Sequence, residues 1–206
     1  MTTFAEPGVA LRSDTGFATA RKAMIDSQLR VSGVNEEFVL SAFAAVARED
    51  FVPESARDVA YTDRAVPLGD GRFLASPLVH GRMLSEAAPT AADRVLLVDG
   101  GSGYLATLVK ALAGSVEVIT PQAAVAKSRK QGDFTLLMID GAIEKLPDSL
   151  AARLAEGARV VTGLVSRGVA RLATGRKLGG EVALLELAEI GIPGLTEFAT
   201  PKSWRF

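Results

Sequence analysis

The hydrophobic pattern is clearest in the middle of the chain, where four apolar residues run into a glycine-rich turn. Residues 95–98 read Val-Leu-Leu-Val, residues 99–103 read Asp-Gly-Gly-Ser-Gly, and apolar positions then recur at helical spacing from Leu105 to Leu112. This pattern predicts a buried parallel strand, a tight turn and the start of a helix. Glycines in such a turn let the backbone approach a nucleotide-like ligand, and the first helix amides can bind its polar groups.

Apolar runs and helical patterns alternate through the second half of the chain. The expected strands cover residues 95–98, 116–119, 136–139, 159–163, 168–174 and 181–187, and the expected helices cover 104–113, 123–130 and 149–155. The last two strands are expected to pair antiparallel. This order predicts an α/β fold, a Rossmann-like sheet with helices on both faces.

The first half of the chain has a helical pattern. Scattered polar residues with Pro7 and Gly8 predict a flexible arm over residues 1–16. Helices are expected over 17–30, from about Asn35, and over 77–87, with an irregular stretch from residue 60 to 71. The chain is therefore divided into the arm, an N-terminal helical extension (17–92) and an α/β core (93–206).

Composition narrows the function classes. The chain has 206 residues, 48% hydrophobic and 23% charged, with a net charge of −1 and a pI near 5.9. This balance gives no electrostatic case for nucleic acid or an anionic membrane. The absence of cysteine and the single histidine exclude disulfides, thiolate ligands and a histidine-rich metal cluster. No apolar run approaches the roughly 18 residues of a membrane span, so a cytoplasmic location is expected.

Several candidate residues have two interpretations. Asp99 or Ser102 could simply cap the helix that follows the glycine turn. The turn also fits a dinucleotide-binding pattern, but the acidic residue expected roughly 20 positions later is absent, which disfavours a nicotinamide enzyme. Asp140 follows a buried strand, where sites of α/β sheets gather, or it caps the next helix. His80 is expected to be partly exposed, without a carboxylate partner.

A set of short motifs, in order along the chain, resembles the protein-L-isoaspartate O-methyltransferase family. The motifs are Met24, Ser27-Gln28-Leu29, Gly33-Val34, Arg48-Glu49, Phe51-Val52-Pro53, Ala60-Tyr61, Asp63, Pro67, Pro77, the 95–104 segment, Ile139-Asp140-Gly141-Ala142-Ile143, Pro147, and Pro201 before Phe206. The resemblance implies a seven-stranded class I methyltransferase fold that binds S-adenosylmethionine. It also implies methylation of isoaspartyl carboxylates in damaged proteins or peptides, with residues 17–92 on the substrate side and no metal.

The resemblance carries a cofactor site onto particular residues of this sequence. These are Asp99, Gly101, Ser102, Gly103, Tyr104, Asp140 and Gly141. On the substrate side, the family's hydroxyl residue aligns with Ala75, while Ser76 lies one position closer to Pro77 and is not matched by it. No catalytic residue is therefore assigned.

The sequence departs from the family at four places. Leu97 stands where an acidic residue is usual, and Asp99 takes the first glycine position of the turn, where a left-handed backbone would add roughly 1–2 kcal/mol of strain. The second strand of the core ends at Thr120 without the acidic residue that binds the ribose. Only 13 residues lie between Thr120 and Phe134, so one strand and helix of the central region are expected to be missing.

Two functions follow from these observations. The first is an active S-adenosylmethionine-dependent methyltransferase, and the second is a pseudoenzyme that keeps the fold and binds a protein or another ligand. The second is favoured because catalysis requires an intact cofactor site. The sheet edge left by the missing strand, or the N-terminal helices, is expected to form a homodimer contact. Trp204 and Phe206 are expected either to cover the core or to bind a partner.

Overall fold

The structure is a computed structural model that describes residues 9–127 and 131–200. A six-stranded sheet lies at its centre, in the order β4-β3-β5-β6-β7-β8. The first four strands in this order are parallel. Strands β7 and β8 pair antiparallel, as expected, and β7 is also antiparallel to β6. The strands are β3 (Arg94–Val98), β4 (Ser115–Ile119), β5 (Phe134–Ile143), β6 (Leu154–Ser166), β7 (Val169–Leu178) and β8 (Glu181–Glu189).

Strand β3 is apolar from Val95 to Val98, where both faces of the sheet are covered. Val95 and Leu97 pack into one core cluster with residues of α3 (Pro77–Ala87) and α4 (Tyr104–Lys110). Leu96 and Val98 pack into the other with residues of α5 (Pro121–Val125) and α6 (Asp148–Ala151). Such two-sided burial explains a continuous apolar run in place of alternation. Leu97 is fully buried, so the position where the resemblance implies an acidic residue is here part of the core.

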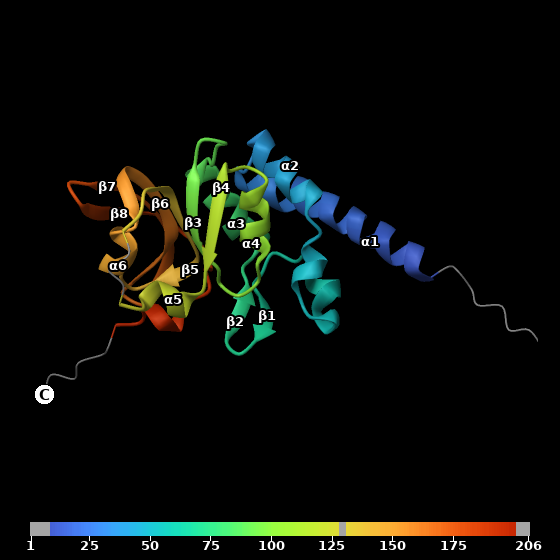
Figure 1. The fold of residues 1–206 in the computed structure, drawn as a ribbon. Helices are drawn as coiled ribbons and strands as arrows, with labels where there is room; N and C mark the ends of the chain where they lie inside the picture. The colour runs from blue at the N-terminus through green and yellow to red at the C-terminus, as the bar shows by residue number, and fades with distance from the viewer. Residues whose placement is uncertain (1–8, 128–130, 201–206) are drawn as a thin grey trace, which may run out of the picture.

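The N-terminal extension is helical from an earlier point than predicted. Helix α1 spans Val9–Met24, so residues 9–16 of the expected arm are helical, and residues 1–8 lie outside the described part. Good helix formers such as Ala10, Leu11 and Arg12 outweigh the polar residues around them. The first turns of α1 project away from the rest of the molecule (Figure 1). The short helices η1 (Ile25–Leu29), η2 (Arg30–Ser32), α2 (Glu37–Ala45), η3 (Arg48–Phe51) and η4 (Glu54–Val59) follow.

The stretch predicted to be irregular contains a β-hairpin. Strands β1 (Val66–Gly69) and β2 (Arg72–Leu74) pair antiparallel at the lower end of the molecule in Figure 1. The tip is tight because Gly69, Asp70 and Gly71 all have left-handed backbone angles, with φ of 98°, 49° and 71°. Glycine and aspartate tolerate this conformation better than other residues. The signal for the hairpin was thus present in the Gly-Asp-Gly sequence.

The central region is shortened, as the residue count predicted. Helix α5 ends at Val125, earlier than the predicted residue 130, and β5 begins at Phe134. The described residues between them form no strand, although residues 128–130 are outside the description. The sheet therefore has six strands where the resemblance implies seven. Strand β4 lies at its edge and is less buried than β3, with Val118 40% exposed.

Candidate functional site

The glycine turn connects β3 to α4 at the carboxyl end of the sheet. Gly101 and Gly103 have φ values of 115° and 72°, which favour glycine. The Asp99 carboxylate lies inside the turn, where Oδ2 accepts a hydrogen bond from the Gly101 amide (3.2 Å) and Oδ1 accepts one from the Gly103 amide (2.8 Å). Ser102 Oγ accepts one from the Tyr104 amide (3.1 Å). The amides of Gly101, Gly103 and Tyr104 are therefore bound by side chains of the turn itself.

The backbone of Asp99 is unstrained. The described non-glycine residues with positive φ are Asp70, Ala88 and Arg167, so the left-handed penalty considered for Asp99 does not arise. Burial raises the pKa of the Asp99 carboxyl above its usual value; the Gly103 amide opposes this rise, and the nearby charge of Asp140 adds to it. The carboxylate thus occupies an environment that disfavours its charged form.

The turn packs tightly against the end of β5. A Cβ on Gly100 would lie 2.2 Å from the carbonyl oxygen of Asp140. A Cβ on Gly141 would lie 2.5 Å from Leu195, in the segment that follows β8. Two backbone hydrogen bonds, of 2.8 and 2.9 Å, join Ala142 to this same segment. Close backbone approach therefore requires Gly100, whereas at Gly141 it is the Leu195 side chain that leaves no room for a Cβ. The segment after β8 covers the end of β5.

Asp140 and His80 form a buried pair. Nε2 of His80 lies 2.8 Å from Oδ1 of Asp140, and the two side chains are 0% and 3% exposed. The prediction of a partly exposed His80 without a carboxylate partner is wrong, because 60 residues separate the two in sequence. The sequence did contain one indication that His80 is buried, because His80, Leu84 and Ala87 are spaced to lie on one face of α3.

Arg48 and Tyr104 lie beside this pair. The buried Arg48 donates from Nε to the carbonyl of Ala60 (2.6 Å) and from Nη2 to the carbonyl of Ala75. Its guanidinium lies 5.0 Å from the centre of the Tyr104 ring, which lies 5.5 Å from the His80 ring. Burial lowers the pKa of Arg48 and raises that of Tyr104. Tyr104 therefore belongs to the core beneath the turn, and sequence reasoning missed the structural role of Arg48.

We call Arg48, His80, Tyr104 and Asp140 the buried polar cluster. Nδ1 of His80 and Oδ2 of Asp140 are buried and have no hydrogen-bond partner among the described residues. A buried imidazole–carboxylate pair can hold a proton, but this one has almost no exposed surface with which to meet a substrate. These contacts connect α3 and the N-terminal helices to the carboxyl end of the sheet, so we interpret the cluster as structural.

A second polar group spans the carboxyl end of the sheet from the outside. Arg72 of β2 forms an ion pair with Glu197 of η5 (Thr196–Phe198), and Gln122 of α5 donates to the same carboxylate (2.7 Å). We call these three residues the Arg72 bridge. The Arg72 side chain lies directly over the turn, because a Cβ on Gly101 would be 3.1 Å from its Cγ. The hydrogen bond from Arg72 holds the pKa of Glu197 below its usual value.

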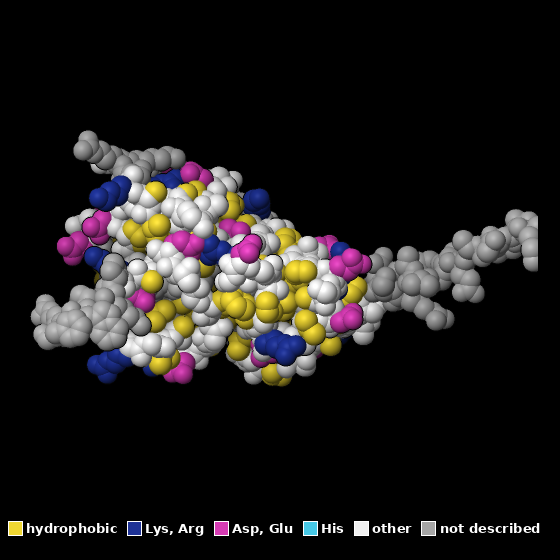
Figure 2. Space-filling view, turned by 90° about the horizontal axis from the view of Figure 1, so that it is seen from below, with side chains coloured by type: hydrophobic (Ala, Val, Ile, Leu, Met, Phe, Trp, Pro, Cys, Tyr) yellow, Lys and Arg dark blue, Asp and Glu magenta, His cyan; other side chains and the backbone are white. Residues whose placement is uncertain are grey.

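Little space remains between the bridge and the glycine turn. The cavity there has a volume of about 10 Å³ and is lined by residues that include Ala75, Gly100 and Asp140. That is room for about one water molecule, whereas sites for small molecules typically measure about 300–1,000 Å³. Figure 2 views the molecule from this end and shows hydrophobic side chains gathered near the hairpin, with charged side chains around them.

The remaining candidate residues lie around this cavity without joining in one site. Ser76 precedes α3, is nearly buried, and accepts the His80 amide through its carbonyl oxygen (3.4 Å). Thr120, at the end of β4, caps α5 by accepting the Ala123 amide (3.2 Å). Within the described residues no group of three or more His, Cys, Asp or Glu could hold a metal ion. In the same part of the chain no helix is long and apolar enough to cross a membrane.

Comparison with known proteins decides the family. The family model described as protein-L-isoaspartate(D-aspartate) O-methyltransferase matches residues 19–123. A Koribacter versatilis protein-L-isoaspartate O-methyltransferase is 33% identical over 197 residues, covering 84% of this chain and 89% of its own length. The chain belongs to the protein-L-isoaspartate O-methyltransferase family. A Rhodopseudomonas palustris member is 31% identical, with 71% of this chain and 70% of its own length covered.

Solved structures of the family share the fold. A Plasmodium falciparum structure, assigned as a protein-L-isoaspartate O-methyltransferase and in complex with S-adenosyl-L-homocysteine, matches with a TM-score of 0.67 and 17% identity over 88% of this chain and 98% of that one. A second protein-L-isoaspartate O-methyltransferase matches with a TM-score of 0.68 and 16% identity over 85% of this chain and 65% of that one. The Rossmann-like α/β methyltransferase fold expected from the sequence is thereby confirmed.

Proposed function

We propose that this chain is a non-catalytic member of its family, which keeps the methyltransferase fold and acts as a binding protein. The family suggests S-adenosylmethionine-dependent methylation of isoaspartyl residues, and the Plasmodium falciparum structure holds S-adenosyl-L-homocysteine. The proposal is that this chain no longer binds that cofactor.

The chemistry makes cofactor binding the deciding property. Transfer of a methyl group from a sulfonium to a carboxylate is a direct displacement. The carboxylate has an unperturbed pKa near 4 and is ionised at neutral pH without help from a base. Catalysis then depends on holding the two reactants in line. A chain that cannot hold the cofactor in place has no other route to this reaction.

The observation that carries the proposal is the position of the Asp99 carboxylate. It already accepts the Gly101 and Gly103 amides, which are the donors that a glycine-rich turn would offer to a ligand. A carboxylate there would also repel the carboxylate of the cofactor's methionine part. These contacts support the proposal that the turn does not hold the cofactor.

Three further observations support the same conclusion. The cavity between Arg72 and the glycine turn, about 10 Å³, is far smaller than a cofactor. At the end of β4, where the family resemblance implies an acidic residue for the ribose, Gln122 is bound to Glu197 instead. The shortened region after α5 removes the strand that would complete this side of the sheet.

The alternative is an active isoaspartyl methyltransferase acting on damaged proteins. One observation favours it: Gly101 and Gly103 have positive φ angles, which let the backbone approach a ligand closely. In that case the Arg72 bridge would have to open when the cofactor binds. The two functions therefore make opposite predictions about the affinity for S-adenosylmethionine and its demethylated product.

Thermal unfolding and calorimetric titration with S-adenosylhomocysteine test the proposal. A ligand at 100 times its dissociation constant adds about 2.7 kcal/mol of stability, which for a chain of this size raises the midpoint by about 5–10 °C. We expect neither a shift nor heat at millimolar ligand. The Asp99→Gly/Arg72→Ala double variant, which removes both obstructing side chains, should bind more tightly than the wild type. A shift of 5–10 °C with the wild type would refute the proposal.

A further inference from the structure

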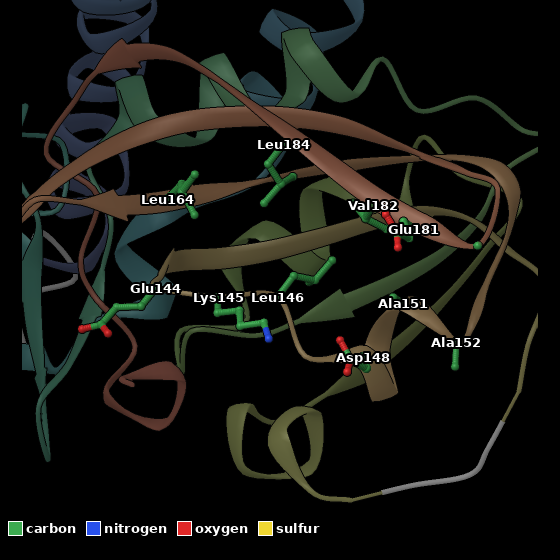
Figure 3. Close-up of a pocket in the computed structure, with 11 residues that line it drawn as sticks. Glu144, Lys145, Leu146, Asp148, Ala151, Ala152, Leu164, Glu181, Val182 and Leu184 are labelled. Carbon is green, nitrogen blue, oxygen red and sulfur yellow. The ribbon is translucent and has the colours of Figure 1, made fainter. Parts of the chain in front are cut away.

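A large cavity lies away from the glycine turn. It has a volume of about 620 Å³ and shares no lining residue with the cavity beside Gly100. It is formed by the segment 144–152, which follows β5, and by residues of β6 and β8 (Figure 3). We call it the β8 groove.

The groove exists because one face of the sheet is incompletely covered. On the opposite face, α3 packs against β6 and β7. On the groove face, the nearby helix α6 has only four residues. Leu164, Val182 and Leu184 therefore remain only partly buried and line the groove, with Leu146 on its other side. Figure 3 shows Leu164 and Leu184 on the strands, across from Leu146. Apolar residues grouped in this way mark binding surfaces.

The margin of the groove is acidic. Glu144, Asp148 and Glu181 line it and are exposed, and Lys145 is the cation among the lining residues. An occupant with apolar side chains and positive charge would therefore match both the floor and the margin. This combination of an apolar floor and a charged margin resembles the core and rim of protein interfaces.

We propose that the C-terminal residues 201–206 of this chain bind in the β8 groove. Their sequence is Pro-Lys-Ser-Trp-Arg-Phe, with two aromatic and two cationic side chains. The last described residue, Thr200, is already held at the margin of the groove, since its amide donates to Glu144 Oε2 (2.8 Å) and its hydroxyl contacts the same carboxylate. The proposal does not depend on whether the chain binds the cofactor.

The covalent connection to Thr200 favours binding of residues 201–206 over binding of a separate molecule. Six extended residues reach up to about 20 Å, and a short tether raises the local concentration of a segment to about the millimolar range. Trp204 and Phe206 each offer a large apolar area for Leu164, Val182 and Leu184 to contact. Lys202 and Arg205 bring charges opposite to those of Asp148 and Glu181.

Tryptophan fluorescence tests the proposal directly, because Trp204 is the only tryptophan in the chain. In the full-length protein we expect blue-shifted emission and protection from acrylamide quenching, relative to a synthetic peptide of residues 196–206. The Leu184→Asn variant and the Asp148→Asn/Glu181→Gln double variant should shift the emission to longer wavelength and lose protection. The Glu54→Gln/Asp58→Asn variant changes the net charge equally at exposed residues of η4 and should behave like the wild type.

Two results of the fluorescence experiment would overturn the proposal, and a dilution series gives a third. One is Trp204 emission and quenching equal to those of the free peptide in the wild-type protein. The other is protection that the groove variants leave unchanged while circular dichroism shows them folded, since the segment would then bind elsewhere. In the dilution series, loss of protection from quenching would mean that the segment occupies the groove of a second copy, which contradicts binding within one chain.

Discussion

The buried pair of His80 and Asp140 permits the most quantitative prediction. The Asp140→Ala substitution removes the carboxylate that lies 2.8 Å from His80 Nε2 and leaves a buried imidazole nitrogen without that partner. Leaving a buried polar group unsatisfied costs about 1–3 kcal/mol. For a chain of 206 residues, each kcal/mol lowers the unfolding midpoint by about 2–4 °C. We therefore expect the midpoint of Asp140→Ala to fall by about 2–12 °C.

A double-mutant cycle isolates the interaction from the other effects of each substitution. The four proteins are the wild type, His80→Ala, Asp140→Ala and the double variant, and denaturant unfolding gives the free energy of each. The loss in the double variant should be smaller than the sum of the single losses by about 0.5–3 kcal/mol, the range for residues in direct contact. The Asp140→Asn variant is the matched control, because it keeps the shape and one acceptor oxygen and should be less destabilised than Asp140→Ala.

Additive losses would refute the reasoning. If the double variant loses the sum of the single losses to within about 0.5 kcal/mol, the two side chains do not stabilise each other. The same conclusion follows if Asp140→Asn and Asp140→Ala are equally destabilised. In either case α3 would be held against the sheet by its apolar residues alone, and the buried polar cluster would have no part in joining the two regions.

Three further predictions concern other parts of the molecule. Burial raises the pKa of the Asp99 carboxyl in the folded state. The wild-type protein therefore loses stability as pH rises from the unfolded pKa, about 3.9, through the folded pKa, so the stability of Asp99→Asn relative to the wild type should increase from pH 4 to pH 7. A stability difference that stays constant with pH in denaturant unfolding would contradict this. Arg48→Lys should lower the free energy of unfolding by about 1.5–3 kcal/mol, because lysine cannot make both hydrogen bonds to the carbonyls of Ala60 and Ala75. An unchanged denaturation midpoint would show that these two hydrogen bonds of the guanidinium do not stabilise the fold. The homodimer expected from the exposed edge of β4 stays a prediction. Sedimentation velocity of the wild type and of Val118→Lys tests it, and a wild-type protein that stays monomeric at high concentration would contradict it.

The local pattern of the sequence determined the central elements of the fold. The apolar run before Asp99 and the glycines after it predicted β3, the turn and α4, because both depend on interactions between residues close in sequence. Helix α3 lies at the predicted residues 77–87. The count of residues between Thr120 and Phe134 also predicted the shortened sheet, since too few were available for another strand and helix.

Only the tertiary structure decided what the candidate site contains. His80 and Asp140 are 60 residues apart, and Arg72 and Glu197 are 125 apart. No local pattern pairs such residues, because their approach depends on how α3, the hairpin and the segment after β8 pack around the sheet. The sequence alone showed that Asp99 replaces a glycine. Its local alternative, that Asp99 or Ser102 binds nearby backbone amides, was also readable from the sequence, and in the structure the Asp99 carboxylate accepts the Gly101 and Gly103 amides.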